Sequence, residues 1–192
     1  MPRFASVNED LILEVGGAND LVLERNGVEV DRRGAEGFGK VLQVVYITDG
    51  VLGTGAITTP LDNTIPQITE GNEALSCSIS PLSASSFLEI DVHITAGEVA
   101  NTGNGITVAL FRDSTANAIA SRGAGSYFTP TLSIQGGMFS FKTTVPSVST
   151  SSTTFTVRVG SDAGSVNWNG WKGINYGGTS NIASLTITEI AQ

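Results

Sequence analysis

Short stretches of alternating apolar and polar residues recur from Val41 to the end of the chain, separated by Gly, Pro, Asn and Ser. A period of two is typical of strands that bury one face, and the separating residues are typical of turns. This spacing predicts an all-β fold, an antiparallel β-sandwich or jelly roll. We expect strands at Leu42–Thr48, Leu75–Ser80, Phe87–Thr95, Ile106–Arg112, Phe139–Val145, Phe155–Val159 and Leu185–Ile190, with weaker candidates at Ala118–Ser121 and Thr131–Ile134.

The clearest alternation runs from Phe87 to Thr95. Because successive side chains of a strand point to opposite faces, every second residue shares a face. We expect the apolar set to lie in the core and the polar set to face outward; the two sets are Leu88, Ile90, Val92 and Ile94, and Glu89, Asp91, His93 and Thr95. The Ala-rich stretch Thr115–Arg122 could form a helical turn, but its neighbours favour strands.

The first 40 residues differ from the rest because they hold 8 of the 18 acidic and 5 of the 10 basic residues. We therefore expect an N-terminal β arm at 1–40 and a jelly-roll-like head at 41–192. A repeat of ten residues begins at Asp10 and again at Asp20, and each copy predicts a short strand closed by a Gly-containing turn. So short a segment cannot bury enough apolar surface to fold alone, so it is expected to dock on another surface, such as that of a neighbouring subunit. Its apolar candidates for attachment are Leu11, Leu13, Leu21, Leu23, Val28 and Val30.

Asn26-Gly27 is the strongest hairpin signal in the chain. A two-residue turn there predicts that Leu23 faces Val30 and that Glu24 faces Glu29. The second pair is unfavourable, because like charges lie directly opposite each other.

Composition excludes several classes of function. The formal charge is −8 and the largest basic group is Arg32-Arg33, which argues against nucleic-acid binding. No apolar run is long enough to insert in a membrane, and the start of the chain lacks the apolar stretch of a secretory signal. One Cys and one His provide neither a disulfide nor a structural zinc site, so no metal and no cofactor are expected.

Catalytic arrangements are weakly supported. His93 and Asp91 share a strand face, but the nucleophile motif G-x-S-x-G is absent, so His93 is expected to be an exposed or interfacial strand residue. Cys77 alternates with Leu75 and Ile79, which predicts a buried and inert thiol. The acidic residues after position 40 are scattered and are expected to be solvated. We therefore expect no catalytic residues.

Two long connections, Asp49–Asn72 and Gly160–Gly178, lack long strands and are candidates for function or for contact with a partner. The second combines aromatic rings, which stack on sugars, with amides, which bond hydroxyl groups. One interpretation is a glycan-binding site; the other is that the rings fill the end of the sandwich or an interface between subunits. The residues concerned are Asn167, Trp168, Asn169, Trp171, Asn175 and Tyr176.

Four separated pieces of the sequence resemble a domain found in structural proteins of tailed bacteriophages, often at the C-terminal end of tail-fibre chains. They are Leu61–Gly71, Val108–Ala118, Ser151–Gly160 and Ser184–Ile190, and the resemblance covers roughly residues 41–192. Residues 19–30 are similar to the short β repeats that precede such heads. The resemblance implies a non-enzymatic virion component, made in the bacterial host cytoplasm and placed on the virion surface, with a β-sandwich head and usually trimeric.

Two roles follow from this resemblance. The first is a homotrimeric short tail fibre or spike for host attachment, whose partners would be tail or baseplate proteins and host-surface glycans. The second is a capsid decoration (cement) protein seated on the major capsid protein of the phage head. This alternative is suggested by the short segment that precedes the domain at 41–192. A hydrolase of surface polysaccharides is the least favoured alternative.

Overall fold

The computed structural model describes the backbone of three short strands at 11–16, 20–25 and 28–33, and residues 39–99, 105–125, 136–175 and 177–192. Regular structure in these residues is β, apart from one short 3₁₀ helix, η1 (Gly178–Ser180). The expectation of an all-β protein is confirmed.

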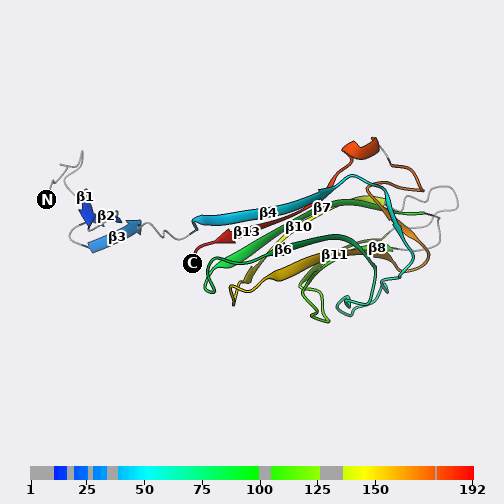
Figure 1. Ribbon diagram of the computed structural model, residues 1–192, viewed down its shortest axis with the longest axis horizontal. Helices are drawn as coiled ribbons and strands as arrows, with labels where there is room; N and C mark the ends of the chain where they lie inside the picture. Colours follow the sequence, from blue (N-terminus) through cyan, green and yellow to red (C-terminus); the bar gives the residue numbers. More distant parts are fainter. Residues whose placement is uncertain are drawn as a thin grey trace.

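Two antiparallel sheets face each other in the part after residue 38 (Figure 1). In the first sheet the long strands lie in the order β4, β13, β7, β10; the short strand β12 pairs with the last residues of β7, and β5 pairs with β12. In the second sheet the order is β6, β11, β8, β9. The first sheet comprises β4 (Val41–Asp49), β13 (Ala183–Ile190), β7 (Phe87–Glu98), β10 (Gly136–Pro146), β12 (Val166–Trp168) and β5 (Gly53–Gly55); the second comprises β6 (Asn72–Ile79), β11 (Thr153–Ser161), β8 (Gly105–Arg112) and β9 (Ala120–Gly125).

This strand order is that of a jelly roll. Among the eight long strands the chain changes sheet at every connection except the β8–β9 hairpin. The result is two four-stranded sheets in which sequence neighbours are mostly separated, as in the double-sheet jelly rolls of viral capsid and lectin domains. The jelly-roll prediction is therefore confirmed in topology as well as in class.

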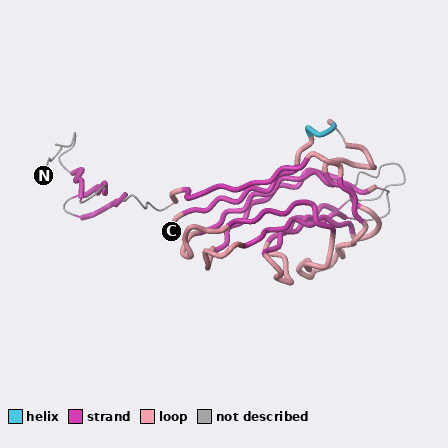
Figure 2. Tube along the Cα trace, viewed as in Figure 1, coloured by secondary structure: helices cyan, strands magenta, loops and turns pink. Residues whose placement is uncertain are grey.

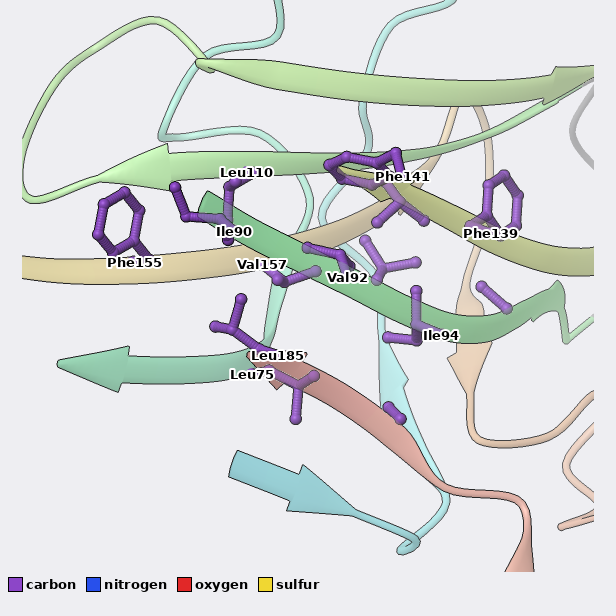
Figure 3. Packing of buried hydrophobic residues seen from close by; sticks show 14 of the residues in the cluster. Leu75, Ile90, Val92, Ile94, Leu110, Phe139, Phe141, Phe155, Val157 and Leu185 are labelled. Atoms are coloured by element: carbon purple, nitrogen blue, oxygen red, sulfur yellow. The ribbon is translucent and has the colours of Figure 1, made fainter. Parts of the chain in front are cut away.

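The hydrophobic core lies between the sheets, and β7 is its central element. Leu88, Ile90, Val92 and Ile94 are each at most 1% exposed, while His93 on the alternate face is exposed, as the alternation predicts. Figure 3 shows Ile90, Val92 and Ile94 of β7 gathered with core side chains of both sheets. The core partners labelled there are Leu75, Leu110, Phe139, Phe141, Phe155, Val157 and Leu185.

Strand β8 is buried on both faces. Leu110 belongs to the core, whereas Phe111 points to the other side of the sheet and is still fully buried. Part of the long connection 50–71 lies alongside this region, because Ile68 N donates to Ala116 O at 2.8 Å and Ala118 N to Pro66 O at 2.9 Å. This connection therefore has a structural task in covering the outer face of the second sheet.

The two ends of the head lie together. Gly39 N donates to Ala191 O at 3.2 Å, and Ala191 N donates to Lys40 O at 2.8 Å. The 3₁₀ helix and the loops around it lie at the opposite end of the sandwich (Figure 2). We call the end with Lys40 and Ala191 the terminal end, and the opposite end the loop end.

Strands β1 (Leu11–Gly16), β2 (Asp20–Arg25) and β3 (Val28–Arg33) form a separate three-stranded antiparallel sheet. Its register places Leu13 opposite Leu23 and confirms the expected pairing of Glu24 with Glu29. The expected pairing of Leu23 with Val30 is wrong: Leu23 lies opposite Asp31, because an irregularity between Leu23 and Glu24 leaves one extra residue on β3. The turn at residues 26–27 lies outside the described residues, and the division into an arm and a head stays a prediction.

Each of the seven main strand predictions is confirmed, with ends that differ by a few residues. The weaker candidate Ala118–Ser121 corresponds to β9, so the helical alternative for that stretch is wrong. Thr131–Ile134 lies outside the described residues. The short strands β5 and β12 were not predicted, because three residues are too few to show a period of two.

Candidate functional site

The candidate site lies at the loop end, where residues 166–175 meet residues 49–55. Strand β12 joins them, since it pairs with β5 on one side and with the end of β7 on the other. The two long connections highlighted by the sequence are thus brought together. Tyr176 lies outside the described residues.

Both tryptophans pack on glycines. A Cβ atom at Gly53 would lie 1.9 Å from Cε2 of Trp168, and one at Gly97 would lie 2.8 Å from Cγ of Trp171. Gly97 is directly opposite Gly136 on β10, where a Cβ would come within 3.2 Å of the Trp171 ring. Both rings are half-buried, and Trp168 also contacts the core. Glycine at these positions therefore lets the two rings lie flat on the sheet.

Asn167 is fully buried and holds three parts of the loop end together. Its Nδ2 donates to Gly53 O at 3.2 Å and to Thr54 Oγ1 at 2.6 Å. Its Oδ1 accepts from Gly173 N at 2.7 Å. The amide is thus engaged on both sides by the chain itself.

Asn169 and Asn175 hold the chain that follows β4. Nδ2 of the fully buried Asn169 donates to the carbonyls of Asp49 and Val51, both at 2.9 Å, and Nδ2 of Asn175 donates to Gly50 O at 2.9 Å. Three successive carbonyls are therefore satisfied by two amides. Asn169 has φ +59°, a left-handed conformation that asparagine tolerates better than most residues.

Three buried polar atoms of the described residues have no hydrogen-bond partner, and all belong to this loop: Asn169 Oδ1, Trp171 Nε1 and Asn175 Oδ1. The exposed side chains of the same end include three apolar ones, Val51 at 64%, Ile174 at 54% and Ile182 at 54%, beside exposed polar ones such as Lys172. Sequence reasoning missed these three, since isolated apolar residues in loops carry no pattern. The loop end thus offers solvent a mixed surface with apolar groups above a layer of buried amides.

This geometry bears on the two interpretations of the loop. The amides of Asn167 and Asn169 are buried and bonded within the chain, so they act in shaping the loop end. The half-buried rings of Trp168 and Trp171 fit the interpretation in which aromatic residues fill the end of the sandwich. Glycan binding stays a prediction, and it would have to use the more exposed side chains of the loop end.

The polar cluster on the outer face of the first sheet is a flat array of surface charges. His93 Nε2 lies 3.1 Å from Asp91 Oδ1, and Lys142 Nζ lies 2.9 Å from Glu89 Oε1. The His93 side chain is 50% exposed, as expected of a strand surface residue. The bond to Glu89 raises the pKa of Lys142.

Cys77 was predicted to be buried but is only half-buried, because it lies on the edge strand β6, and this partial burial raises the pKa of its thiol. A raised pKa keeps the thiol protonated and poorly nucleophilic, in line with the expectation of an inert cysteine.

Within the described residues, no group of three or more His, Cys, Asp or Glu side chains is placed to hold a metal ion. The same part of the chain contains no helix with the length and apolar character needed to cross a bilayer.

Comparison with known proteins gives structural neighbours only. No protein-family model matches the sequence, and no curated protein matches it. The fold is similar to a structure of the Gt strain of infectious bursal disease virus, with 14% identity, a TM-score of 0.38, and coverage of 93% of this chain and 42% of that chain. It is also similar to the VP2 subviral particle of that virus, with 13% identity, a TM-score of 0.34, and coverage of 95% and 47%. The chain therefore spans less than half the length of these structures.

Proposed function

We propose that this chain is a non-enzymatic structural protein of a bacteriophage virion, a homotrimeric short tail fibre or spike that takes part in host attachment. The observation that carries the proposal is the difference between the two ends of the jelly roll. Residues 39–40 are bonded to Ala191 at the terminal end, and the long loops gather at the opposite end. Such a head can be held by the segment before residue 39 while it presents its loops outward. The sequence resemblance to phage tail-fibre domains supports the same role.

The surface chemistry of the loop end supports adhesion. Val51, Ile174 and Ile182 are exposed, and the half-buried ring of Trp171 lies in the same loop as Ile174. Exposed apolar and aromatic groups on a rigid support are typical of contact surfaces. Three copies would multiply weak contacts through avidity.

A catalytic role receives less support. His93 contacts Asp91 on a strand face where the two side chains are 50% and 33% exposed, so this pair is open to water, whereas catalysis is favoured where water is expelled. A polysaccharide hydrolase would be recognised by release of reducing ends from host envelope glycans, and we expect none.

The alternative is a capsid decoration protein. The β1–β3 sheet favours it, because its outer strands β1 and β3 each pair on one side only among the described strands. Open strand edges of this kind can add to the sheets of a neighbouring shell subunit.

Imaging of intact phage particles with the chain located tests the proposal. A few trimers at the tail mean a fibre or spike, whereas scores or hundreds of copies on the head mean a decoration protein. Absence of the chain from purified particles contradicts both. A chain lacking residues 1–38 is expected to remain folded but to be missing from particles, and its incorporation would contradict attachment through the arm.

Contact with the host is tested separately. Ile174→Asp and Val51→Asp are expected to reduce binding to host cells or to a glycan array at least tenfold, while Leu82→Asp, at a 65% exposed position beside Glu189 at the terminal end, leaves it unchanged. Equal binding by all three variants would contradict the role of the loop end.

A further inference from the structure

One long side of the sandwich is formed by two edge strands. Among the described strands β4 pairs only with β13, and β6 pairs only with β11. The two lie next to each other across the sandwich. We call residues 41–49 and 72–79 the β4/β6 side.

The hydrophobic core reaches the surface on the β4/β6 side. Ile47 lies opposite Leu185, which is fully buried, yet Ile47 itself is 38% exposed. Val45, Ala74 and Cys77 contact the core but are only partly buried. These side chains occupy core positions that the described residues leave partly uncovered.

The outward face of β4 also carries exposed apolar and aromatic side chains, beside the polar Thr48. Val44 is 51% exposed opposite Thr188, and Tyr46 is 70% exposed opposite Thr186. Val41, at the start of the strand, is 53% exposed. A long apolar edge strand is a ready template for association, and soluble proteins usually protect it with charge, proline or bulges.

The opposite side of the sandwich is closed. There the edge strand β10 buries its core-facing rings, with Phe139 at 4% and Phe141 at 5% exposure. The guanidinium of Arg122 on β9 lies 5.7 Å from the centre of the Phe141 ring and covers it. The contrast shows that an open core is specific to the β4/β6 side.

The distribution of charge favours a second copy of this chain as the partner on the β4/β6 side. The chain carries a formal charge of −8, so two copies repel each other across most surfaces. The 17 residues of β4 and β6 contain only two acidic residues, Asp49 and Glu73, and no basic residue. A basic partner would find little to recognise there, whereas an identical chain can approach with little repulsion.

We propose that the β4/β6 side is the interface through which copies of this chain pack around a common axis. The proposal rests on the homo-oligomer of the proposed function and names the surface that builds it. Residues 39–40 directly precede β4, so copies joined along this side also bring together the points at which their N-terminal segments enter the sandwich. Apolar side chains of one copy would complete the core cover of the next.

The full-length chain tests this with charges placed on the exposed side chains. Light scattering after size exclusion is expected to give three times 19.9 kDa for the unmodified protein. Val44→Asp with Tyr46→Asp is expected to give 19.9 kDa, and Met138→Asp on the opposite edge strand keeps the trimer mass. An unmodified protein of monomer mass contradicts the homo-oligomer itself. A trimeric double variant contradicts only the β4/β6 side.

Cross-linking gives a readout that does not depend on variant stability. In a Cys77→Ser background, where each chain carries a single thiol, Val44→Cys treated with a short bismaleimide is expected to give covalent dimers, and Met138→Cys is expected to stay monomeric on a denaturing gel. Equal cross-linking of both cysteines, or none at Val44→Cys in a protein of trimer mass, would overturn the proposed interface.

Discussion

The buried carboxylate of Glu189 accepts a 2.6 Å hydrogen bond from the hydroxyl of Ser86, although 103 positions separate the two residues. The same carboxylate accepts from Leu82 N at 2.9 Å, Ser83 N at 3.0 Å and Gln43 Nε2 at 2.7 Å. One fully buried side chain at the end of β13 therefore fixes the β6–β7 connection at the terminal end of the head.

Replacement of this carboxylate by an amide is expected to weaken the head. In Glu189→Gln one oxygen becomes an NH₂ group, and each oxygen of Glu189 now faces two donors. Hydrogen bonds to a charged group contribute about 1.5–3 kcal/mol each, and partial rearrangement limits the loss, so we expect the free energy of unfolding to fall by about 2–4 kcal/mol. Denaturant unfolding of the full chain measures the change.

Glu89→Gln is the matched control. Glu89 forms its ion pair with Lys142 on the solvent-exposed sheet face, where such pairs contribute about 0–1 kcal/mol. If the two variants lose the same amount, the Glu189 network does not stabilise the fold as described.

The same group predicts a pH dependence. Burial acts to raise the pKa of Glu189, but the four donors outweigh it and hold the pKa below the ordinary 4.5. Because the folded pKa is depressed, the contribution to stability is present above the unfolded pKa and is lost as the pH falls through the folded pKa. The gap in unfolding free energy between the natural chain and Glu189→Gln should be constant above about pH 5.5 and shrink below about pH 4.5. A gap that widens in acid would contradict this.

Asn169 combines two roles that different substitutions separate. Asn169→Gly removes both bonds to the carbonyls of Asp49 and Val51 and relieves the left-handed backbone of its Cβ, while Asn169→Ala removes the same bonds but keeps a Cβ in that conformation. Alanine in a left-handed conformation is disfavoured by about 1 kcal/mol relative to glycine. We expect both variants to be less stable than the natural chain, and Asn169→Ala to be the worse by about 1 kcal/mol. Thermal unfolding of both decides it, and equal losses would exclude backbone strain.

The fold could be predicted from the sequence because its signals are local. The alternation at Leu88–Ile94 requires one buried and one exposed face, and the structure buries the apolar face as predicted. The register of β2 and β3 was harder, since a single extra residue moves Leu23 from Val30 to Asp31. A bulge depends on contacts that the pattern of two strands does not contain.

The sequence located the loop end but did not show what each of its residues does. Its Trp and Asn residues are conspicuous, yet their tasks depend on neighbours more than 100 positions away, such as Gly53 for Trp168 and Asp49 for Asn169. The open β4/β6 side was missed because alternation in β4 predicts burial of one face, whereas its exposure depends on what lies beside the strand in space.

Gly53 provides a sharp test of how Trp168 is held. A Cβ at this position would lie 1.9 Å from the ring, so Gly53→Ala must displace either the indole or strand β5. Overpacking of this kind costs about 1–3 kcal/mol, and we expect that loss together with a red shift of tryptophan fluorescence as the ring becomes more exposed. The chain contains only two tryptophans, both in this loop, so the signal reports on the loop end. Gly137→Ala is the control, because its Cβ would meet nothing within 4 Å, and it should leave the emission unchanged. An unshifted spectrum and unchanged stability in Gly53→Ala would show that Trp168 does not pack on β5.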